Sequence, residues 1–313
     1  MQGRHFSAMR QTAGSLAAAF VLLQAILGAP RAAFAAAGRV TILSGGIPRT
    51  AILIEHHRLK QARRPLIIIL RAGRSRGARL HRSTGFDELA RSSGAVVVYP
   101  QPLSGHFADS PGPELIRDQL FIHDLIARLT AQGLASPSKI FLVGTTTGGM
   151  LALRLACDPA NHFAGLAVLG ASLPLDLAGS CKPSHPLPFM MIAGTADPII
   201  PFQGGTALLP HGKIELASVE TTLSTFGKAA LCGEGKTSTV FLDKDPKDGT
   251  HVYLDKLNNC AAPIELVRIE GGGHEMPGLS SEAGTGSGSG PAFSIGDINS
   301  AKLIWDFFRP FRG

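Results

Sequence analysis

The sequence predicts an α/β domain with a largely parallel sheet. Short β-rich runs alternate with amphipathic stretches from about Val40 onward, which is the pattern of strands connected by helices. Several strand-like runs, such as Leu-Ile-Ile-Ile-Leu at residues 66–70, are apolar on both faces, as a strand covered by helices on both sides requires. The chain has 313 residues, of which 44% are hydrophobic, and this excludes a disordered tail, a collagen and a coiled coil. No internal repeat or linker appears, so residues 38–313 are expected to form one domain.

Each expected element follows from its local pattern. In the segment 114–131, Leu115, Ile122 and Leu129 fall on one apolar face at helical spacing. The expected strands are residues 51–55, 65–70, 95–99, 139–143, 165–169, 189–193, about 239–242 and 264–269. The expected helices are residues 86–92, 114–131, 150–157, 219–230 and 299–308. Residues 284–290 are rich in Gly and Ser and are expected to form a surface loop.

The first 37 residues resemble a secretory signal peptide. Arg4 and Arg10 flank the start, residues 13–28 are almost wholly apolar, and Ala33-Phe34-Ala35 and Ala35-Ala36-Ala37 both fit an A-x-A cleavage site. The alternative is an uncleaved membrane anchor, for which the apolar run is short. We expect the mature protein to be secreted, extracellular or periplasmic, with no membrane contact after signal cleavage.

The formal net charge of +7 falls to about +4 when the predicted signal peptide is left out. Without residues 1–37, 27 basic residues face 23 acidic ones, which does not argue for a nucleic-acid partner. The basic residues are nevertheless concentrated, with nine of them and no acid between Arg58 and Arg82. These are either solvated loop charges, or Arg71 or Arg74 recognises an acidic group of a substrate.

The cysteine count is even, and in an oxidising compartment disulfides are the default for an even count. Three pairings are open, and the sequential one would close two short loops. The four residues are Cys157, Cys181, Cys232 and Cys260. A metal site is the rival interpretation, but no C-x-x-C spacing or cluster of histidines supports it, so neither a metal nor a cofactor is expected.

A strand, a glycine-rich turn and a helix follow one another without a linker around Gly144 and Gly148. Their spacing is that of the G-x-S-x-G nucleophile elbow, a strained turn that raises one side chain above the sheet. Thr146 stands in the place of the serine. Its hydroxyl is a nucleophile, but its methyl group crowds the turn and restricts the side-chain rotamer. The alternative is an ordinary turn without chemistry.

Two later strands are followed by an acid and then a histidine, in the order that such an elbow enzyme uses. Asp197 follows the strand at 189–193, and its simpler interpretation is a turn residue that caps local amides. His274 follows the strand at 264–269 and three glycines, and its simpler interpretation is a surface histidine in a loop. In a catalytic triad, His274 would be the general base and Asp197 would hold its tautomer.

These linked motifs resemble the secreted poly(3-hydroxybutyrate) depolymerase-like esterases, which have feruloyl and acetyl-xylan esterase relatives within the α/β-hydrolase fold. The resemblance is carried by Gly85-Phe86-Asp87-Glu88-Leu89-Ala90, Gly148-Gly149-Met150, Gly194-Thr195-Ala196-Asp197-Pro198 and Gly271-Gly272-Gly273-His274. It implies a carboxylic ester hydrolase with an acyl-enzyme mechanism and a polymeric or oligomeric ester as substrate. The oligomeric state cannot be inferred.

The departures from that family concern the chemistry itself. Thr146 stands for the elbow serine, Arg71-Ala72 for the His-Gly pair of the oxyanion hole, and Met276 for a tryptophan after the histidine. The oxyanion hole would then use the backbone N–H of Thr147 and a donor near Arg71 and Ala72. Two alternatives to the depolymerase-like hydrolase stay open: a feruloyl or acetyl-xylan type of esterase, and a catalytically impaired binding protein on the hydrolase scaffold.

Overall fold

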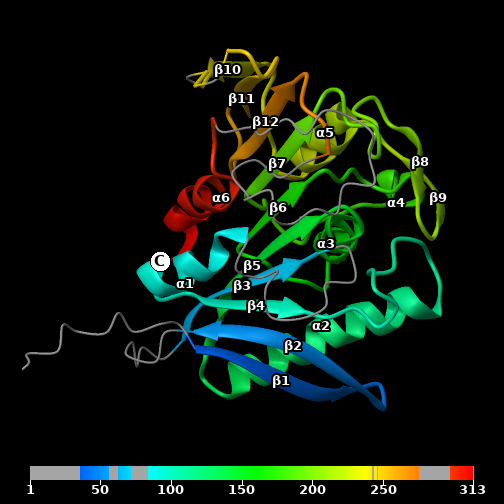
Figure 1. Ribbon diagram of the computed structural model, residues 1–313, viewed down its shortest axis with the longest axis vertical. Helices are drawn as coiled ribbons and strands as arrows, with labels where there is room; N and C mark the ends of the chain where they lie inside the picture. The colour runs from blue at the N-terminus through cyan, green and yellow to red at the C-terminus, as the bar shows by residue number, and fades with distance from the viewer. Residues whose placement is uncertain are drawn as a thin grey trace, which may run out of the picture. The chain divides into compact units, whose positions relative to one another are not determined.

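The computed structural model describes residues 36–55, 63–71, 84–241, 243–244, 246–274 and 297–312, and these build a ten-stranded sheet (Figure 1). In spatial order the strands are β1 (Ala36–Ser44), β2 (Ile47–Glu55), β4 (Val96–Pro100), β3 (Arg64–Leu70), β5 (Ala135–Thr145), β6 (Gly165–Leu169), β7 (Phe189–Gly194), β12 (Ile264–Glu270), β11 (His251–Leu257) and β10 (Lys236–Val240). The strands from β4 to β12 in this order pair in parallel. Antiparallel strands complete both edges. The predicted α/β class with a mostly parallel sheet is confirmed.

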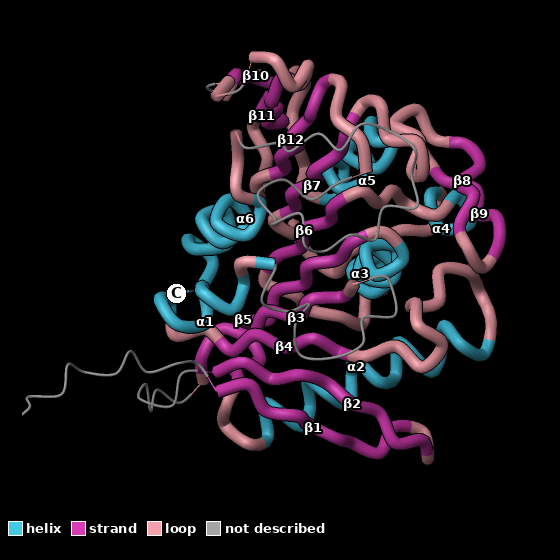
Figure 2. Tube along the Cα trace, viewed as in Figure 1, coloured by secondary structure: helices cyan, strands magenta, loops and turns pink. Residues whose placement is uncertain are grey.

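Helices cover both faces of the sheet, as Figure 2 shows. They are α1 (Phe86–Ser93), α2 (Pro113–Ala131), α3 (Thr147–Cys157), α4 (Leu175–Ala178), α5 (Val219–Ala229), α6 (Ser300–Phe308) and the 3-10 turn η3 (Arg309–Arg312). One hydrophobic core lies between the sheet and α2, α3 and α5, and a second lies between the sheet and α1 and α6. The central strands are therefore buried on both faces, which explains their continuous apolar runs.

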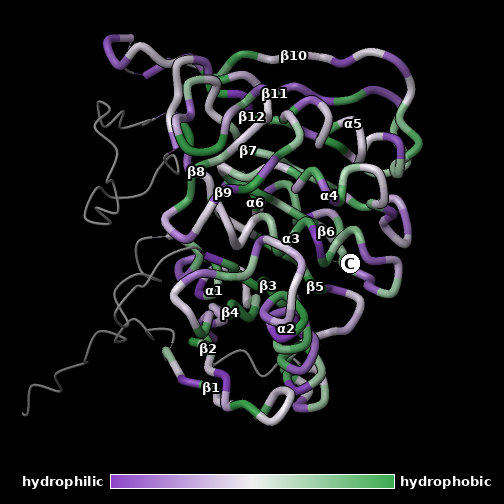
Figure 3. The backbone as a smooth tube through the Cα atoms, turned by 90° about the vertical axis from the view of Figure 1, so that its right-hand side faces the viewer, coloured by the Kyte–Doolittle hydropathy of each residue, from purple (hydrophilic) through white to green (hydrophobic). Residues whose placement is uncertain are grey.

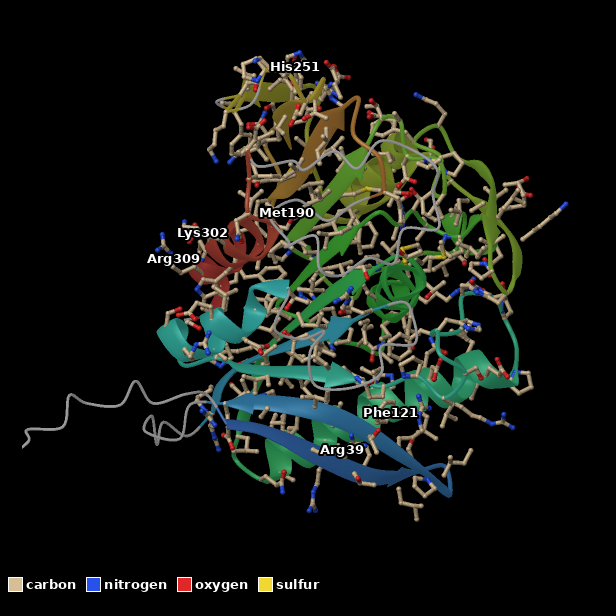
Figure 4. All side chains as sticks on the ribbon, viewed as in Figure 1. Arg39, Phe121, Met190, His251, Lys302 and Arg309 are labelled. Atoms are coloured by element: carbon tan, nitrogen blue, oxygen red, sulfur yellow. A yellow bond between two sulfur atoms is a disulfide. The ribbon has the colours of Figure 1, made fainter. Side chains whose placement is uncertain are left out.

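The outer surfaces of α2 and α6 carry charged residues, in keeping with their amphipathic sequences, and Ile116 and Leu120 of α2 are exposed beside them. In Figure 3, α2 carries both hydrophobic and hydrophilic colours along its length. In Figure 4, Lys302 and Arg309 extend from the outer side of α6, and Lys302 forms an exposed ion pair with Asp306, one turn further on. Among the described residues, no helix combines the length and the apolar composition that crossing a bilayer would need.

The elements that the sequence does not reveal lie at edges or outside the main sheet. Strands β8 (Gly205–Leu209) and β9 (Gly212–Leu216) form a separate antiparallel hairpin, and β11 alternates without a long apolar run. The strand expected near residues 239–242 is shifted, because β10 is Lys236–Val240 and ends before Phe241. Every residue of β10 is exposed, so its sequence does not alternate between apolar and polar residues as that of a half-buried strand would.

The first strand overlaps the leader predicted over residues 1–37. Strand β1 begins at Ala36, and residues 1–35 lie outside the described part of the chain. Cleavage after Ala35 would leave β1 whole, whereas cleavage after Ala37 would remove its first two residues. Of the two predicted cleavage positions, the first therefore fits the fold better. The expected loop at residues 284–290 also lies outside the described residues.

A buried ion pair connects the sheet to α2. Arg49 of β2 donates to Asp118 of α2 at 2.7 Å, and the two side chains are 1% and 8% exposed. The guanidinium also lies 4.1 Å from the ring centre of Phe121, which is labelled in Figure 4. The other oxygen of Asp118 accepts from the N–H of Ala108, in the loop that follows β4. One carboxylate thus fixes a strand, a helix and a loop.

One of the two interpretations of the basic run between Arg58 and Arg82 was that its charges are solvated, and Arg64 does not fit that interpretation. Its side chain is 5% exposed and donates to Glu55 of β2 at 2.5 Å. Burial of a charge is tolerated here because an opposite charge neutralises it. Arg63 and Arg71 are also described, whereas the other six basic residues of the run lie outside the described residues.

The predicted disulfides are present, and their pairing is sequential. Cys157 at the end of α3 is joined to Cys181, and Cys232 after α5 is joined to Cys260 before β12. Each bridge closes a loop of modest length, with separations of 24 and 28 residues. The first holds the C-terminal end of α3, the helix that directly follows Thr146, and the second holds α5 to the segment that leads into β12.

We expect Asp118→Ala to lower the free energy of unfolding by about 3–5 kcal/mol, because it leaves Arg49 buried without a counter-charge. Urea unfolding followed by circular dichroism measures the change. Arg117→Ala, an exposed substitution in the same turn of α2, is the matched control and should shift the value by less than about 0.5 kcal/mol. Equal effects of the two substitutions would contradict the role given to the ion pair.

The paired substitution Cys232→Ala/Cys260→Ala should lower the free energy of unfolding by about 2–5 kcal/mol, because the unfolded chain regains the freedom of the loop. Under reducing conditions the parent protein should approach the stability of a variant that lacks both bridges. A parent protein whose unfolding midpoint is the same with and without reductant would rule out stabilisation by the disulfides.

Candidate active site

Thr146 occupies a sharp turn at the carboxyl end of β5, directly before α3. Its φ of +50° and ψ of −119° are an unusual conformation for a β-branched residue. Two backbone hydrogen bonds hold it there. Its N–H donates to the carbonyl of Leu169 on β6 at 3.2 Å, and its carbonyl accepts from Met150 of α3 at 3.0 Å. The surrounding structure thus imposes the strained backbone that the elbow pattern predicts.

Two glycines of the turn allow the backbones on either side of Thr146 to touch. A Cβ atom on Gly148 would lie 2.2 Å from the carbonyl oxygen of Leu70 at the end of β3. A Cβ atom on Gly144 would lie 2.5 Å from the Cα of Gly149 in α3. Any larger residue at these positions would push α3 away from the sheet, which explains the glycine spacing of the motif.

Asp197 and His274 lie close together because they follow neighbouring strands. Strands β7 and β12 pair in parallel, with Gly194 opposite Ile269, so the segments after both strands leave the same edge of the sheet. His274 Nδ1 is 2.7 Å from Asp197 Oδ2, and His274 Nε2 is 2.8 Å from Thr146 Oγ1. The three side chains that the sequence suggests therefore form a continuous hydrogen-bonded chain, although 128 residues separate Thr146 from His274.

The carboxylate of Asp197 is buried and fixed on both oxygens. Its side chain is 2% exposed, whereas that of His274 is 19% exposed. Oδ1 accepts from the N–H groups of Ile199 and Ile200 at 2.8 and 2.9 Å, which leaves Oδ2 for the imidazole. Asp197 therefore does both things that the sequence suggested, because it caps the amides of a local turn and also binds the histidine.

The arrangement fixes which proton each atom can carry. An ionised Asp197 only accepts hydrogen bonds, so the Nδ1–H of His274 donates to it. Nε2 then has a free lone pair that accepts the hydroxyl proton of Thr146. A hydroxyl beside such a base, with the base held by a third group, is the arrangement that activates a nucleophile.

The other predicted elements of the site are only partly described. Thr147 is the first residue of α3, where backbone N–H groups have no acceptor within the helix and form the positive end of the helix dipole. Ala72, Arg74 and Met276 lie outside the described residues. The structure therefore gives one side of the expected oxyanion hole.

Arg71 directly follows β3 beside the elbow, and its side chain interacts electrostatically with Tyr99 of the neighbouring strand β4. Burial lowers the pKa of its guanidinium, and the nearby phenol of Tyr99 acts in the opposite direction. Burial raises the pKa of Tyr99 well above its ordinary value, and the charge of Asp87 raises it further. The hydroxyl of Tyr99 donates to Asp87 at 2.9 Å and lies 2.8 Å from Thr84. This polar cluster lies at the start of α1.

The amides of Ile199 and Ile200 belong to the site, and the sequence suggested a cap of local amides by Asp197 without naming these two residues. The available signal was the Asp-Pro-x-x pattern itself, since an aspartate two or three residues before backbone N–H groups commonly caps them. Within the described ranges, no three His, Cys, Asp or Glu side chains gather in a way that would hold a metal ion.

Sequence comparisons relate the chain to esterases. It is 29% identical over 229 residues to "Putative esterase NocK" of Nocardia uniformis, covering 69% of this chain and 66% of that protein. It is 26% identical over 232 residues to feruloyl esterase B of Piromyces equi, covering 71% of this chain and 37% of that protein. The chain thus spans just under two thirds of the first relative and little more than a third of the second. No protein-family model matches the chain.

Solved structures with the same architecture are distant in sequence. Acetyl xylan esterase from Aspergillus awamori superposes with a TM-score of 0.59 at 11% identity, covering 88% of this chain and 99% of that one. Prolyl oligopeptidase B from Galerina marginata gives a TM-score of 0.56 at 10% identity, covering 90% of this chain and 37% of that one. Likeness at this level concerns the fold alone, and the chain has the α/β-hydrolase fold.

Proposed function

We propose that this protein hydrolyses carboxylic esters through an acyl-enzyme, with Thr146 as nucleophile, His274 as general base and acid, and Asp197 as the residue that orients the histidine. The observation that carries the proposal is the hydrogen-bonded chain from Thr146 Oγ1 through both ring nitrogens of His274 to Asp197 Oδ2. The esterase relatives support the reaction class.

In the first half-reaction, Thr146 Oγ1 attacks the ester carbonyl carbon while its proton passes to His274 Nε2. The carbonyl oxygen gains negative charge, and the N–H of Thr147 at the positive end of α3 would stabilise it together with a donor of the segment Arg71-Ala72. When the intermediate collapses, the bond to the leaving alcohol breaks. The alcohol takes the proton from His274, and the acyl group stays on Thr146.

In the second half-reaction, water replaces the alcohol. His274 takes a proton from the water, the resulting oxygen attacks the acyl carbon, and the bond to Thr146 Oγ1 breaks with return of the proton to Thr146. Asp197 remains ionised throughout and stabilises the imidazolium. Its two bonds from Ile199 and Ile200 keep the carboxylate from rotating away from the ring.

For the substrate, we propose an ester of a polymer or oligomer. The motif resemblance points to hydroxyalkanoate esters, whereas the names of the relatives favour feruloyl or acetyl esters of plant polysaccharide. We further propose export of the protein by removal of the segment that ends at residue 35 or 37, which the two disulfides support. No cofactor enters the reaction.

A second function is favoured by one specific observation, the methyl group of Thr146. In the elbow conformation this methyl restricts both the rotamer of the hydroxyl and the approach of a carbonyl carbon. A scaffold with a hindered nucleophile but an intact acid and base would bind an ester without turning it over. Hydrolysis by variants at this one position separates the two functions.

We expect Thr146→Ala to lower kcat/KM for p-nitrophenyl butyrate by about 10³-fold or more, because the acyl group loses its attachment point. Thr146→Ser should keep or raise kcat, because it removes the methyl and keeps the hydroxyl. Initial rates with purified proteins measure both effects. Thr145→Ser, the same change one residue earlier, is the matched control and should alter kcat/KM by less than about threefold.

If the parent protein and Thr146→Ala are equally inactive while Thr146→Ser gains activity, the binding function is correct and the esterase proposal is wrong. If Thr146→Ser is as inactive as Thr146→Ala, the assignment of the elbow itself is wrong. Parallel assays with methyl ferulate and with a hydroxybutyrate oligomer then decide the substrate class.

We expect Asp197→Asn to lower kcat by about 10³–10⁴-fold with little change in the melting temperature. The asparagine oxygen still accepts the N–H groups of Ile199 and Ile200, but its NH₂ group faces Nδ1 and forces the proton onto Nε2. Asp124→Asn, on the partly exposed side of α2, serves as the control and should leave kcat unchanged. A similar kcat for both variants would remove Asp197 from the mechanism.

A further inference from the structure

Two segments that leave the carboxyl edge of the sheet meet away from the triad. One is the loop 101–112, which follows β4, and the other is the tip of the β8–β9 hairpin, which lies beside that loop in Figure 1. His211 of the tip lies 2.6 Å from Asp109 of the loop, measured from Nε2 to Oδ2. The ring of His211 also stacks on that of His106, with centroids 3.7 Å apart and planes at 13°.

The loop side of this contact is firmly held. Arg154 of α3 donates two hydrogen bonds to the carbonyl of Asp109, at 3.0 and 2.8 Å, and its guanidinium is paired with Asp176 of α4. The preceding residue, Ala108, donates to the buried Asp118. The Asp109 side chain is 9% exposed, and its second oxygen accepts from Ser110 at 2.9 Å. Movement at this contact would therefore come from the hairpin.

The base of the hairpin is connected to the triad. Apolar residues of both hairpin strands pack with Met150 of α3 and with Ile200 in a small cluster separate from the two main cores. Ile200 is one of the two residues whose N–H groups hold Asp197. The segment between residues 197 and 216 thus begins at the carboxylate that orients His274, passes the tip at His211, and returns to the cluster.

We propose that His106, His211 and Asp109 form a pH-sensitive clasp that keeps the β8–β9 hairpin against the loop 101–112 and releases it when both imidazoles are protonated. Imidazole is the side chain whose charge changes in the mildly acidic range. Protonation of His211 alone strengthens its bond to Asp109, because the bond then joins opposite charges. Protonation of His106 as well places two positive rings face to face at 3.7 Å, where they repel each other.

The charges around the clasp leave this repulsion without full compensation. Asp109 is the carboxylate that contacts His211, and it supplies one negative charge for two imidazolium rings. Arg154, which faces the same aspartate from α3, is positive and is itself neutralised by Asp176 from α4. The charged residues of β9, Lys213 and Glu215, are both exposed and of opposite sign. At acidic pH the contact therefore carries an excess of positive charge.

Release of the hairpin would loosen the cluster around Ile200 and with it the support of Asp197. This consequence rests on the proposed ester hydrolysis, whereas the clasp itself does not. The opening can be measured without any substrate, so the two proposals can fail separately.

Hydrogen exchange followed by mass spectrometry on peptides covering residues 205–216 tests the clasp at pH about 8 and about 5, the range in which imidazole titrates. After correction for the intrinsic exchange rate, protection of the hairpin should fall about tenfold or more on acidification, because local opening becomes easier. His106→Phe keeps the stacked ring without its charge, and His211→Gln keeps a donor for Asp109 without a charge. Either variant should remove most of the fall, so one of them suffices if the other folds poorly.

The control is His162→Phe, in the other stacked pair of histidines, His162 with His185, between α3 and β7. This variant should show the same fall in hairpin protection as the parent. Equal hairpin protection at both pH values in the parent protein, or an undiminished fall in both His106→Phe and His211→Gln, would overturn the proposal. If hairpin protection falls at acidic pH in the parent protein but the parent hydrolyses no ester, the clasp is supported and the esterase proposal is wrong.

Discussion

The contact of Gly148 with the carbonyl of Leu70 brings three parts of the molecule to one point. It lets the first turn of α3 lie directly against the end of β3, with backbone touching backbone and no side chain between them. The hydroxyl of Thr146, the amino end of α3 and the residues that follow β3 therefore meet at the centre of the sheet. A nucleophile, the positive end of a helix and an oxyanion donor can act on the same ester carbonyl only when they lie within a few ångströms of one another. The strained backbone of Thr146 is stabilised by the packing around it, because α3 is buried over its whole length.

Asp197 shows how one residue serves the fold and the site together. Its Oδ1 organises the turn after β7, and its Oδ2 fixes the tautomer of His274, so the turn and the histidine are oriented by one rigid group. Thr146, by contrast, is held in a conformation that its own side chain disfavours. A serine would satisfy the same backbone with less crowding. Asp197 and His274 are thus well held, and the proposed chemistry depends on the freedom of the Thr146 hydroxyl.

The sequence predicted those parts of the fold whose burial leaves a clear pattern. Central strands such as β3 and β7 are apolar throughout, and α2 repeats its apolar residues at helical spacing. The edge strand β10 is exposed on all sides and was misplaced, and the hairpin β8–β9 packs only in a small cluster and was not identified. The start of α3 was expected at Met150 but lies at Thr147, because glycines conceal the first turn of a helix from propensity arguments. The residues of the site were found because each follows a recognisable strand. The amides of Ile199 and Ile200 lie within the local turn that the sequence suggested for Asp197, whereas the stacking of His106 on His211 is a long-range contact that spacing along the chain does not encode.

The distance in sequence between the members of the triad affects the order in which the protein acquires its site during synthesis. Thr146 and Asp197 are made first, and His274 follows 77 residues after Asp197, directly behind β12, the strand that pairs with β7 on the side away from β6. A nascent chain that ends before β12 contains the hydroxyl and the carboxylate but lacks the base between them. The proposed triad is therefore complete only once β12 and the residues directly after it have been made.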